Sequence, residues 1–326
     1  MSEKLPLKLT MKEPYSRERL IPVRIRGYID LLRPFTLIPP FFVSMFIMFS
    51  SLIYNGKIAL LSNWWGLIVT IAQASLTLAI LNAASNALNQ ATDVESDSIS
   101  KPYRPIPRGV VKPDEAQSIA YILYFFALLR SLTINIWFGL FVFIIMLFTV
   151  TYSLPPRIKR FLFLNQIWIA IPRGALGILA SWSVFGSPFQ KEPLVIGTIA
   201  TLFFIGGMTT KDIVDSMADK RTGTHTLVNT FGTKKAALIS LPFLFFPFAM
   251  IPFLINNGIL NTYLLPLTIF TIPSCVVFYL MIKESESKTL ENIHAWSLMY
   301  VEYLFFAVGF SLLVVFGEMG VIKILF

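Results

Sequence analysis

The sequence has one cysteine, two histidines and few charged side chains, and each of these scarcities excludes a class of protein. The lone Cys275 lies inside an apolar run and has no second cysteine with which to form an internal disulfide. His225 and His294 do not have the spacing of a metal site. Charged residues make up 14% of the chain, against about 25% in ordinary soluble proteins, so a soluble globular fold is not expected.

Targeting and lipidation signals are also missing. The first 27 residues contain seven Lys and Arg and no apolar core, so they are not a cleavable signal peptide, and we interpret residues 1–27 as a cytoplasmic N-terminal tail. Because Cys275 is internal, the chain does not end in a prenylation signal. A net charge of +9 raises nucleic acid as a partner, but no nucleic-acid-binding motif is present, so none is expected.

Long apolar runs are abundant instead. Hydrophobic residues make up 55% of the chain, and a membrane-spanning helix needs about 20 consecutive, mostly apolar residues. Residues 28–326 are therefore expected to form an all-α, polytopic membrane bundle of about nine transmembrane helices. The expected spans are 34–54, 64–90, 115–132, 134–153, 163–185, 194–213, 236–255, 260–282 and 296–317. The third and fourth are weakly separated, which leaves eight as the alternative count.

The loop charges are strongly biased to one side of the predicted membrane. With nine spans, 21 Lys and Arg residues fall on the side of the N-terminal tail and about four fall on the other. Positive charge favours the cytoplasmic side, so the N-terminus is predicted to be cytoplasmic. The acidic residues gather on the same side, although this orientation rule does not require them there. They need a separate explanation.

Two acidic clusters at the ends of predicted spans supply that explanation. In each cluster, residues four apart fall on one face of a helix. The first, after the second span, is Asn89, Asp93 and Asp97; the second, after the sixth span, is Asp212, Asp215 and Asp219. Carboxylates at this spacing repel one another, so they call for a compensating cation unless they simply solvate the helix ends.

The chemistry of the two clusters favours magnesium. Aspartate oxygens with no nearby histidine or cysteine suit a hard ion, and magnesium takes most of its remaining ligands from water and substrate phosphate. The predicted substrate is therefore a phosphate ester. Arg104, in a proline-rich loop, and Lys211, beside Asp212, are the candidates to contact its phosphate. Arg108 and Lys112 are open between a phosphate contact and a purely topological charge.

These motifs carry a family resemblance. The run Asn89-x3-Asp93-x3-Asp97, followed by Arg104-Pro-Ile, resembles the first motif of the UbiA-type superfamily of intramembrane prenyltransferases. The run from Lys211 to Asp219 resembles its second. Segments 30–36 and 152–159 are similar to two further family segments, and the resemblance covers residues 28–315. One departure is Gln90, where the family often has Asp.

The resemblance implies the function and the ligands. A polyprenyl group, geranylgeranyl or longer, would pass from its diphosphate to a lipophilic acceptor, and pyrophosphate would be released. Two Mg²⁺ ions would bridge the diphosphate between the Asp clusters with help from Asn89, while Arg104 and Lys211 would stabilise the leaving group. The bundle would surround a central cavity that opens to the cytoplasmic side. The acceptor stays open between an aromatic or quinone precursor and geranylgeranylglyceryl phosphate, because the motifs resemble archaeal digeranylgeranylglyceryl phosphate synthases and chlorophyll synthases.

Polar residues within the spans are the remaining candidates. Arg33 and Arg173 are predicted to hold the acceptor's polar head, although Arg173 follows a proline and is equally suited to bond freed carbonyls. Tyr152 is open between acceptor contact and an interface anchor. Glu302 is expected to hydrogen-bond a neighbouring helix. The alternative functions are a membrane transporter and a non-catalytic prenyl-lipid-binding protein.

Overall fold

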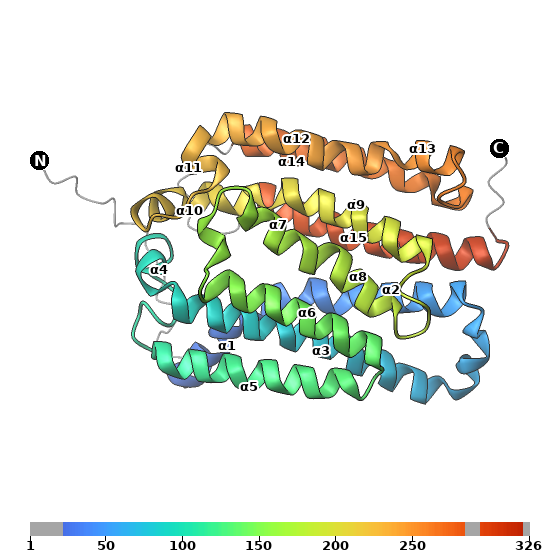
Figure 1. Ribbon diagram of the computed structural model, residues 1–326, viewed down its shortest axis with the longest axis horizontal. Helices are drawn as coiled ribbons and strands as arrows, with labels where there is room; N and C mark the ends of the chain where they lie inside the picture. The colour runs from blue at the N-terminus through green and yellow to red at the C-terminus, as the bar shows by residue number, and fades with distance from the viewer. Residues whose placement is uncertain (1–21, 284–293, 322–326) are drawn as a thin grey trace, which may run out of the picture.

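The computed structural model describes residues 22–283 and 294–321, and these two ranges contain helices and turns but no β-strand. The helices pack side by side in a bundle (Figure 1). In chain order they are α1 (Val23–Leu32), η1 (Pro34–Leu37), α2 (Ile38–Tyr54), η2 (Lys57–Asn63), α3 (Trp64–Thr92), α4 (Val94–Ser100), α5 (Pro113–Leu132), α6 (Ile136–Ser153), η3 (Ile158–Arg160), α7 (Leu164–Ile171), η4 (Pro172–Leu176), α8 (Gly177–Trp182), α9 (Lys191–Gly207), α10 (Thr209–Arg221), α11 (Leu227–Phe231), α12 (Thr233–Ala249), α13 (Ile251–Asn256), η5 (Thr262–Phe270), α14 (Thr271–Lys283) and α15 (His294–Glu318).

The all-α, polytopic prediction is confirmed, and its count of nine spans is approximate. In the described part of the chain, seven helical segments are long and apolar enough to cross a membrane. They are 23–54, 57–92, 136–153, 191–221, 233–256, 262–283 and 294–318. The expected spans 115–132 and 163–185 are also helical, as α5 and as the run α7, η4 and α8. These two are not among the seven; α5 carries Asp114, Glu115 and Arg130, and a π-helical turn at Pro172 interrupts the other run.

The third and fourth expected spans are separate helices. A short turn at 133–135 ends α5, and the side chain of Asn135 caps α6 by accepting a hydrogen bond from the backbone N–H of Phe138 at 2.8 Å. The Asn135 amide also donates to the carbonyl oxygen of Ser183 at 2.9 Å, which fixes the turn against a distant part of the chain. A capping side chain of this kind satisfies backbone groups that a helix start leaves unpaired.

Two large apolar cores divide the bundle. One joins α9, α12, α14 and α15, and the other joins α2, α3, α5 and α6 (Figure 1). Most spanning helices are apolar on all sides, as expected where one face meets protein and the other meets lipid. The candidate site draws residues from both halves of the bundle.

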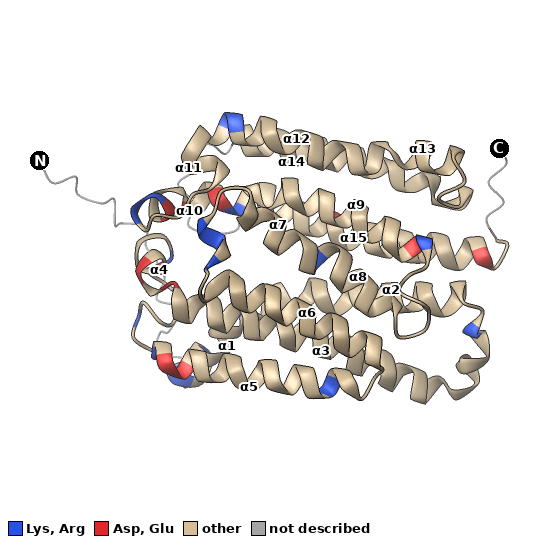
Figure 2. Cartoon of the chain, viewed as in Figure 1, with Lys and Arg blue, Asp and Glu red and all other residues tan. Residues whose placement is uncertain are grey.

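Charged side chains gather mainly at the end of the bundle where α4 and α10 lie (Figure 2). The prediction for the first acidic cluster is wrong in one respect, because it is not a stripe on one continuous helix. Helix α3 ends at Thr92, and Asp93 occupies the break (φ −108°, ψ 22°) before α4 begins. Residues 1–21 of the predicted tail, and the acidic residues at 284, 286 and 291, lie outside the described residues.

Candidate active site

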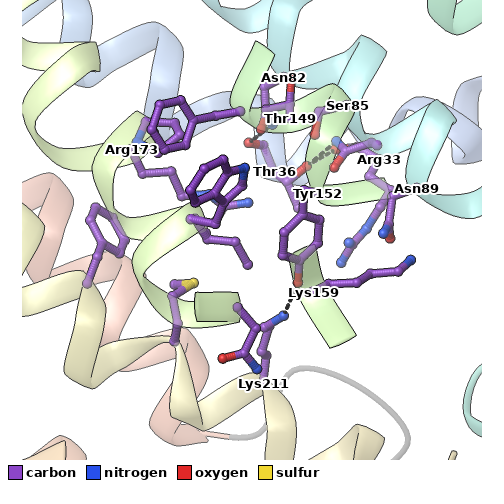
Figure 3. Close-up of a pocket in the computed structure, with 18 of the residues that line it drawn as sticks. Arg33, Thr36, Asn82, Ser85, Asn89, Thr149, Tyr152, Lys159, Arg173 and Lys211 are labelled. Atoms are coloured by element: carbon purple, nitrogen blue, oxygen red, sulfur yellow. Dashed lines mark hydrogen bonds between the residues drawn. The ribbon is translucent and has the colours of Figure 1, made fainter. Parts of the chain in front are cut away.

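A cavity of about 320 Å³ lies between the two halves of the bundle. The structure brings all of the predicted site residues to its walls. Figure 3 shows Arg33, Asn89, Tyr152, Arg173 and Lys211 among them. They are Arg33, Asn89, Asp93, Asp97, Arg104, Tyr152, Arg173, Lys211, Asp212, Asp215 and Asp219. Their shared location is an observation, while the role of each remains a prediction.

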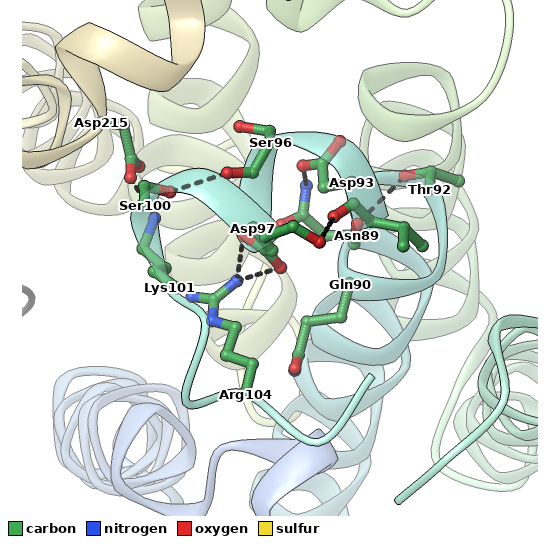
Figure 4. Close-up of polar contacts among 12 residues, drawn as sticks. Asn89, Gln90, Thr92, Asp93, Ser96, Asp97, Ser100, Lys101, Arg104 and Asp215 are labelled. Atoms are coloured by element: carbon green, nitrogen blue, oxygen red, sulfur yellow. Dashed lines mark hydrogen bonds and ion pairs between the residues drawn. The ribbon is translucent and has the colours of Figure 1, made fainter. Parts of the chain in front are cut away.

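Asp93, at the break between α3 and α4, contacts cations of the loop between α6 and α7. Its Oδ1 contacts the ammonium of Lys159 and lies 3.2 Å from a guanidinium nitrogen of Arg157. The side-chain amide of Asn89 donates to its Oδ2 at 2.9 Å (Figure 4). Burial lowers the pKa of Lys159, an effect that the adjacent Asp93 carboxylate opposes. Asp93 is therefore held from three directions.

Asp97 and Arg104 form a buried ion pair beside it. One guanidinium nitrogen of Arg104 donates to both carboxylate oxygens of Asp97, at 3.0 and 2.8 Å (Figure 4). The side chains are only 5% and 7% exposed, so few water molecules reach the pair. Burial raises the pKa of Asp97, and the positive charges of Arg104 and Lys101 oppose that shift.

The second cluster lies on α10 and is less well satisfied. The ammonium of Lys211 donates to the phenol oxygen of Tyr152 at 2.7 Å and lies 3.7 Å from Oδ1 of Asp212. Asp212 is 1% exposed, and within residues 22–283 and 294–321 its buried Oδ2 has no hydrogen-bond partner. Leaving a buried carboxylate oxygen unpaired is costly, so this side of the cavity favours an additional positive group.

An ion pair between Lys101 and Asp215 links the two clusters. Helices α4 and α10 pack against each other, and the ammonium of Lys101, just after α4, contacts Oδ1 of Asp215 on α10 (Figure 4). These residues are separated by 114 positions in the chain. The acidic ends of two spans therefore meet at one cavity.

Sequence reasoning missed three cations of the site. Lys101, Arg157 and Lys159 were counted only as loop charges that set membrane orientation, but all three line the cavity and bind aspartates. Their positions gave a partial signal, since Lys101 follows the first cluster directly and Lys159 ends the family-like segment 152–159. Arg108 and Lys112, by contrast, do not line the cavity.

Three amide side chains on α3 fix the wall that carries Arg33. They are spaced by four residues and donate to backbone carbonyl oxygens at the junction of α1 and η1. Asn82 donates to Thr36 at 2.9 Å, Asn86 to Leu32 at 3.0 Å, and Gln90 to Leu31 at 2.7 Å. At this junction Arg33 has a left-handed backbone (φ 54°), which non-glycine residues rarely adopt. Gln90 therefore lies outside the cavity and links α3 to the end of α1 through its hydrogen bond to Leu31.

Away from the acids the cavity is lined by apolar and aromatic side chains. Phe148, Trp168, Phe204, Tyr300 and Tyr303 are among them. Glu302 lies outside this lining, and its Oε1 accepts a hydrogen bond from Ser274 of α14 at 2.6 Å, as expected for a contact between helices. The cavity thus combines a charged end with an apolar region.

The donor set fits magnesium. The carboxylates come from two elements that face one cavity, and the orphaned Oδ2 of Asp212 marks a place where positive charge is missing. In the described ranges, no three His, Cys, Asp or Glu residues are gathered closely enough to hold a metal alone.

Comparison with known proteins gives the family. The UbiA prenyltransferase family matches residues 37–301. The digeranylgeranylglyceryl phosphate synthase of Methanosphaera stadtmanae is 25% identical over 288 residues, which cover 86% of this chain and 98% of that protein. The chloroplastic homogentisate solanesyltransferase of Arabidopsis thaliana is 29% identical over 74% of this chain and 67% of that protein.

Solved structures agree with the fold. A UbiA homologue from Archaeoglobus fulgidus, bound to GPP and Mg²⁺, superposes with a TM-score of 0.65 at 17% identity, covering 89% of this chain and 99% of that one. The chain belongs to the UbiA prenyltransferase family, as the family resemblance of its motifs predicted. It is an integral, multi-pass membrane prenyltransferase, and this assignment favours enzymatic activity over the transporter alternative.

Proposed function

We propose that this prenyltransferase moves a polyprenyl group from its diphosphate to a lipophilic acceptor, with two magnesium ions at the acidic end of the cavity. The observation that carries the proposal is the meeting of α4 and α10, where Lys101 and Asp215 join two acidic clusters at one cavity. The names of the relatives support the substrates, because they specify polyprenyl transfer to a glyceryl phosphate or to homogentisate. The solved neighbour with GPP and Mg²⁺ supports the donor and the ion.

The metal ligands would come from both clusters. Asn89, Asp93 and Asp97 would serve one ion, and Asp212, Asp215 and Asp219 would serve the other. When bound, Mg²⁺ neutralises diphosphate charge and makes the diphosphate a better leaving group.

The cations of the site would exchange partners as the donor binds. Lys101, Arg104 and Lys159 now neutralise aspartates, and each is buried at 7–8% exposure. With the carboxylates as metal ligands, these cations and Lys211 would be available to hold diphosphate oxygens. They then stabilise the negative charge that develops as the C–O bond breaks.

The remaining chemistry needs a dry, apolar space. The bond between C1 of the prenyl chain and the diphosphate oxygen breaks, and its electron pair leaves with the pyrophosphate. A carbon or oxygen of the acceptor forms the new bond to C1 and loses a proton. The apolar lining excludes water from the allylic cation, and rings such as those of Trp168 and Tyr300 are suited to cation–π stabilisation. The acceptor classes are those that the relatives' names specify.

The charged end of the bundle is proposed to face the cytoplasm. The lysines and arginines of the loops around α4 and α10 support this orientation (Figure 2). The described part of the tail begins with α1 at Val23, so the proposed boundary at residue 27 lies within that helix.

The test is pyrophosphate release from geranylgeranyl diphosphate by the full chain in lipid nanodiscs, with magnesium or with excess chelator. A panel of glyceryl ether phosphate, 4-hydroxybenzoate and homogentisate serves as acceptors. We expect release only with magnesium, and loss of release in Asp93→Ala. Turnover that survives both chelation and Asp93→Ala would remove the mechanism, and donor binding without release would identify a non-catalytic lipid-binding protein.

A further inference from the structure

The cavity ends inside the bundle and does not run through it. The lining residues farthest from the acidic end are Ser44 on α2, Leu78 on α3, Ile145 on α6 and Ser181 on α8. Helix α2 continues from Ser44 to Tyr54, and in that described stretch no residue after Ser44 lines the cavity. We call the level of Ser44, Leu78, Ile145 and Ser181 the deep end of the cavity.

A packed layer of apolar side chains lies directly beyond the deep end. Met48 lies one turn beyond Ser44 on the same face of α2, and Val142 lies one turn beyond Ile145 on the same face of α6. Both side chains are 0% exposed and belong to the same apolar core. Protein cores are packed as densely as organic crystals, so a ligand that reached farther would have to displace these side chains.

Two serine hydroxyls complete this layer between α2 and α3. The Oγ atoms of Ser44 and Ser75 lie 3.0 Å apart in a hydrogen bond, and the two residues are 2% and 0% exposed. A hydroxyl that is buried without a partner is costly, so this hydrogen bond stabilises the close contact of the two helices. We call Ser44, Met48, Ser75 and Val142 the floor of the cavity.

The distance from the acidic end to the floor follows from one helix. Asn89 and Ser75 both lie on α3, so they are roughly 21 Å apart at a rise of about 1.5 Å per residue. An extended chain covers about 1.2 Å per main-chain bond, so an isoprene unit, which adds four such bonds, is about 5 Å long. Four units span about 19 Å and fit above the floor, whereas five span about 24 Å and do not.

We infer that the floor sets an upper limit of four isoprene units on the donor, so that geranylgeranyl diphosphate is preferred to any longer polyprenyl diphosphate. This inference rests on the proposed function of the cavity and deepens it, because that function leaves the length of the donor open. A fifth unit would have to enter the packed layer around Met48, and overpacking of that kind is unfavourable.

The test is a competition among donors of different length. The full chain in nanodiscs receives magnesium, the three acceptors named above and an equimolar mixture of farnesyl, geranylgeranyl, geranylfarnesyl and solanesyl diphosphates. Mass spectrometry follows the loss of each donor, and the relative rates give the ratios of kcat/KM. We expect the four-unit donor to be consumed at least about 10-fold faster than the five-unit donor, and the nine-unit donor to be used least.

Three variants make the test specific to the floor. Met48→Ala removes the side chain below Ser44, so the five-unit donor should come within about 3-fold of the four-unit donor. Leu78→Phe fills the deep end and should shift the preference to the three-unit farnesyl donor. Leu52→Ala is the matched control, because Leu52 is also 0% exposed and lies one further turn along the same face of α2, outside the cavity. Its preference should equal that of the unmodified chain, and size-exclusion elution confirms that each variant is folded.

Equal use of the four-, five- and nine-unit donors by the unmodified chain would overturn the inference, because the tail would then leave the cavity by another route. A preference that Met48→Ala leaves unchanged would also overturn it. Binding of each donor without acceptor is measured in parallel through tryptophan fluorescence, since Trp168 and Trp296 line the cavity. Binding that weakens beyond four units, without consumption of any donor, would support the floor while contradicting the proposed catalytic function.

Discussion

The two acidic clusters look alike in sequence but differ in how their charges are satisfied. In the first, Asp93 contacts Lys159, Arg157 and Asn89, and Asp97 is paired with Arg104. In the second, Asp215 contacts Lys101, but no residue in the described part of the chain hydrogen-bonds the buried Oδ2 of Asp212.

This difference suggests that the carboxylates of the two clusters have different roles. The first cluster is cross-linked to distant loops, so it holds the charged end of the cavity together as well as facing its ligands. The second cluster retains unsatisfied negative charge, so an added cation gains most there. Four predictions, which use five substitutions, break or sharpen this contrast.

The largest expected effect is on turnover. It concerns Asp93 and Asp215, which each contact a lysine ammonium of the site. Asp93→Asn and Asp215→Asn should each lower magnesium-dependent pyrophosphate release by about 10³-fold, because each removes a charge that helps to place the ion and the diphosphate. Release is measured with saturating magnesium and donor. Asp114→Asn, at the start of α5 and outside the cavity, is the control. A variant that keeps a tenth of the activity would contradict the assigned role.

The next effect is on stability and should differ between the clusters. Asp97→Asn leaves the Arg104 guanidinium buried without its counter-charge, so the free energy of unfolding should fall by about 3 kcal/mol. Asp212→Asn removes a carboxylate that lacks full pairing, so the metal-free protein should be at least as stable as the parent. Unfolding by SDS titration in chelator measures both. Equal losses in the two variants would show that the clusters are satisfied alike.

A smaller effect concerns magnesium affinity. Asp212→Asn should raise the magnesium concentration needed for half-maximal release by about 10-fold, since the unpaired oxygen is the ligand that an ion satisfies most favourably. Magnesium titrations of activity supply the measurement. If the magnesium concentration for half-maximal release were unchanged, Oδ2 of Asp212 would not contact the ion.

The smallest effect concerns the hydrogen bond between Gln90 and Leu31, beside the first cluster. Gln90→Ala removes the hydrogen bond to the carbonyl oxygen of Leu31 and should cost about 1 kcal/mol of stability. Gln117→Ala, an exposed amide bonded to Tyr121, should cost much less. The same SDS titration compares them. If the Gln90 variant were as stable as the Gln117 variant, the hydrogen bond from Gln90 to Leu31 would not contribute to stability.

Much of the site could be predicted, and the limits have physical causes. The spacing of Asn89, Asp93 and Asp97 placed them near one another because four residues complete about one helical turn. It did not reveal the break at Asp93, since nothing in that local pattern specifies where α3 ends. The cationic partners of Asp93 lie 64 and 66 positions away in the chain, and no local periodicity connects them to it.

The sequence by itself determined the membrane bundle and the charged end, because lipid demands long apolar helices and tolerates clustered charge only near water. Only the tertiary structure decided which cation meets which carboxylate, because Lys101 reaches Asp215 through the packing of α4 on α10. Packing likewise placed the Arg173 guanidinium over the ring of Tyr300 at the cavity wall, since the surroundings of a buried charge depend on every helix around it.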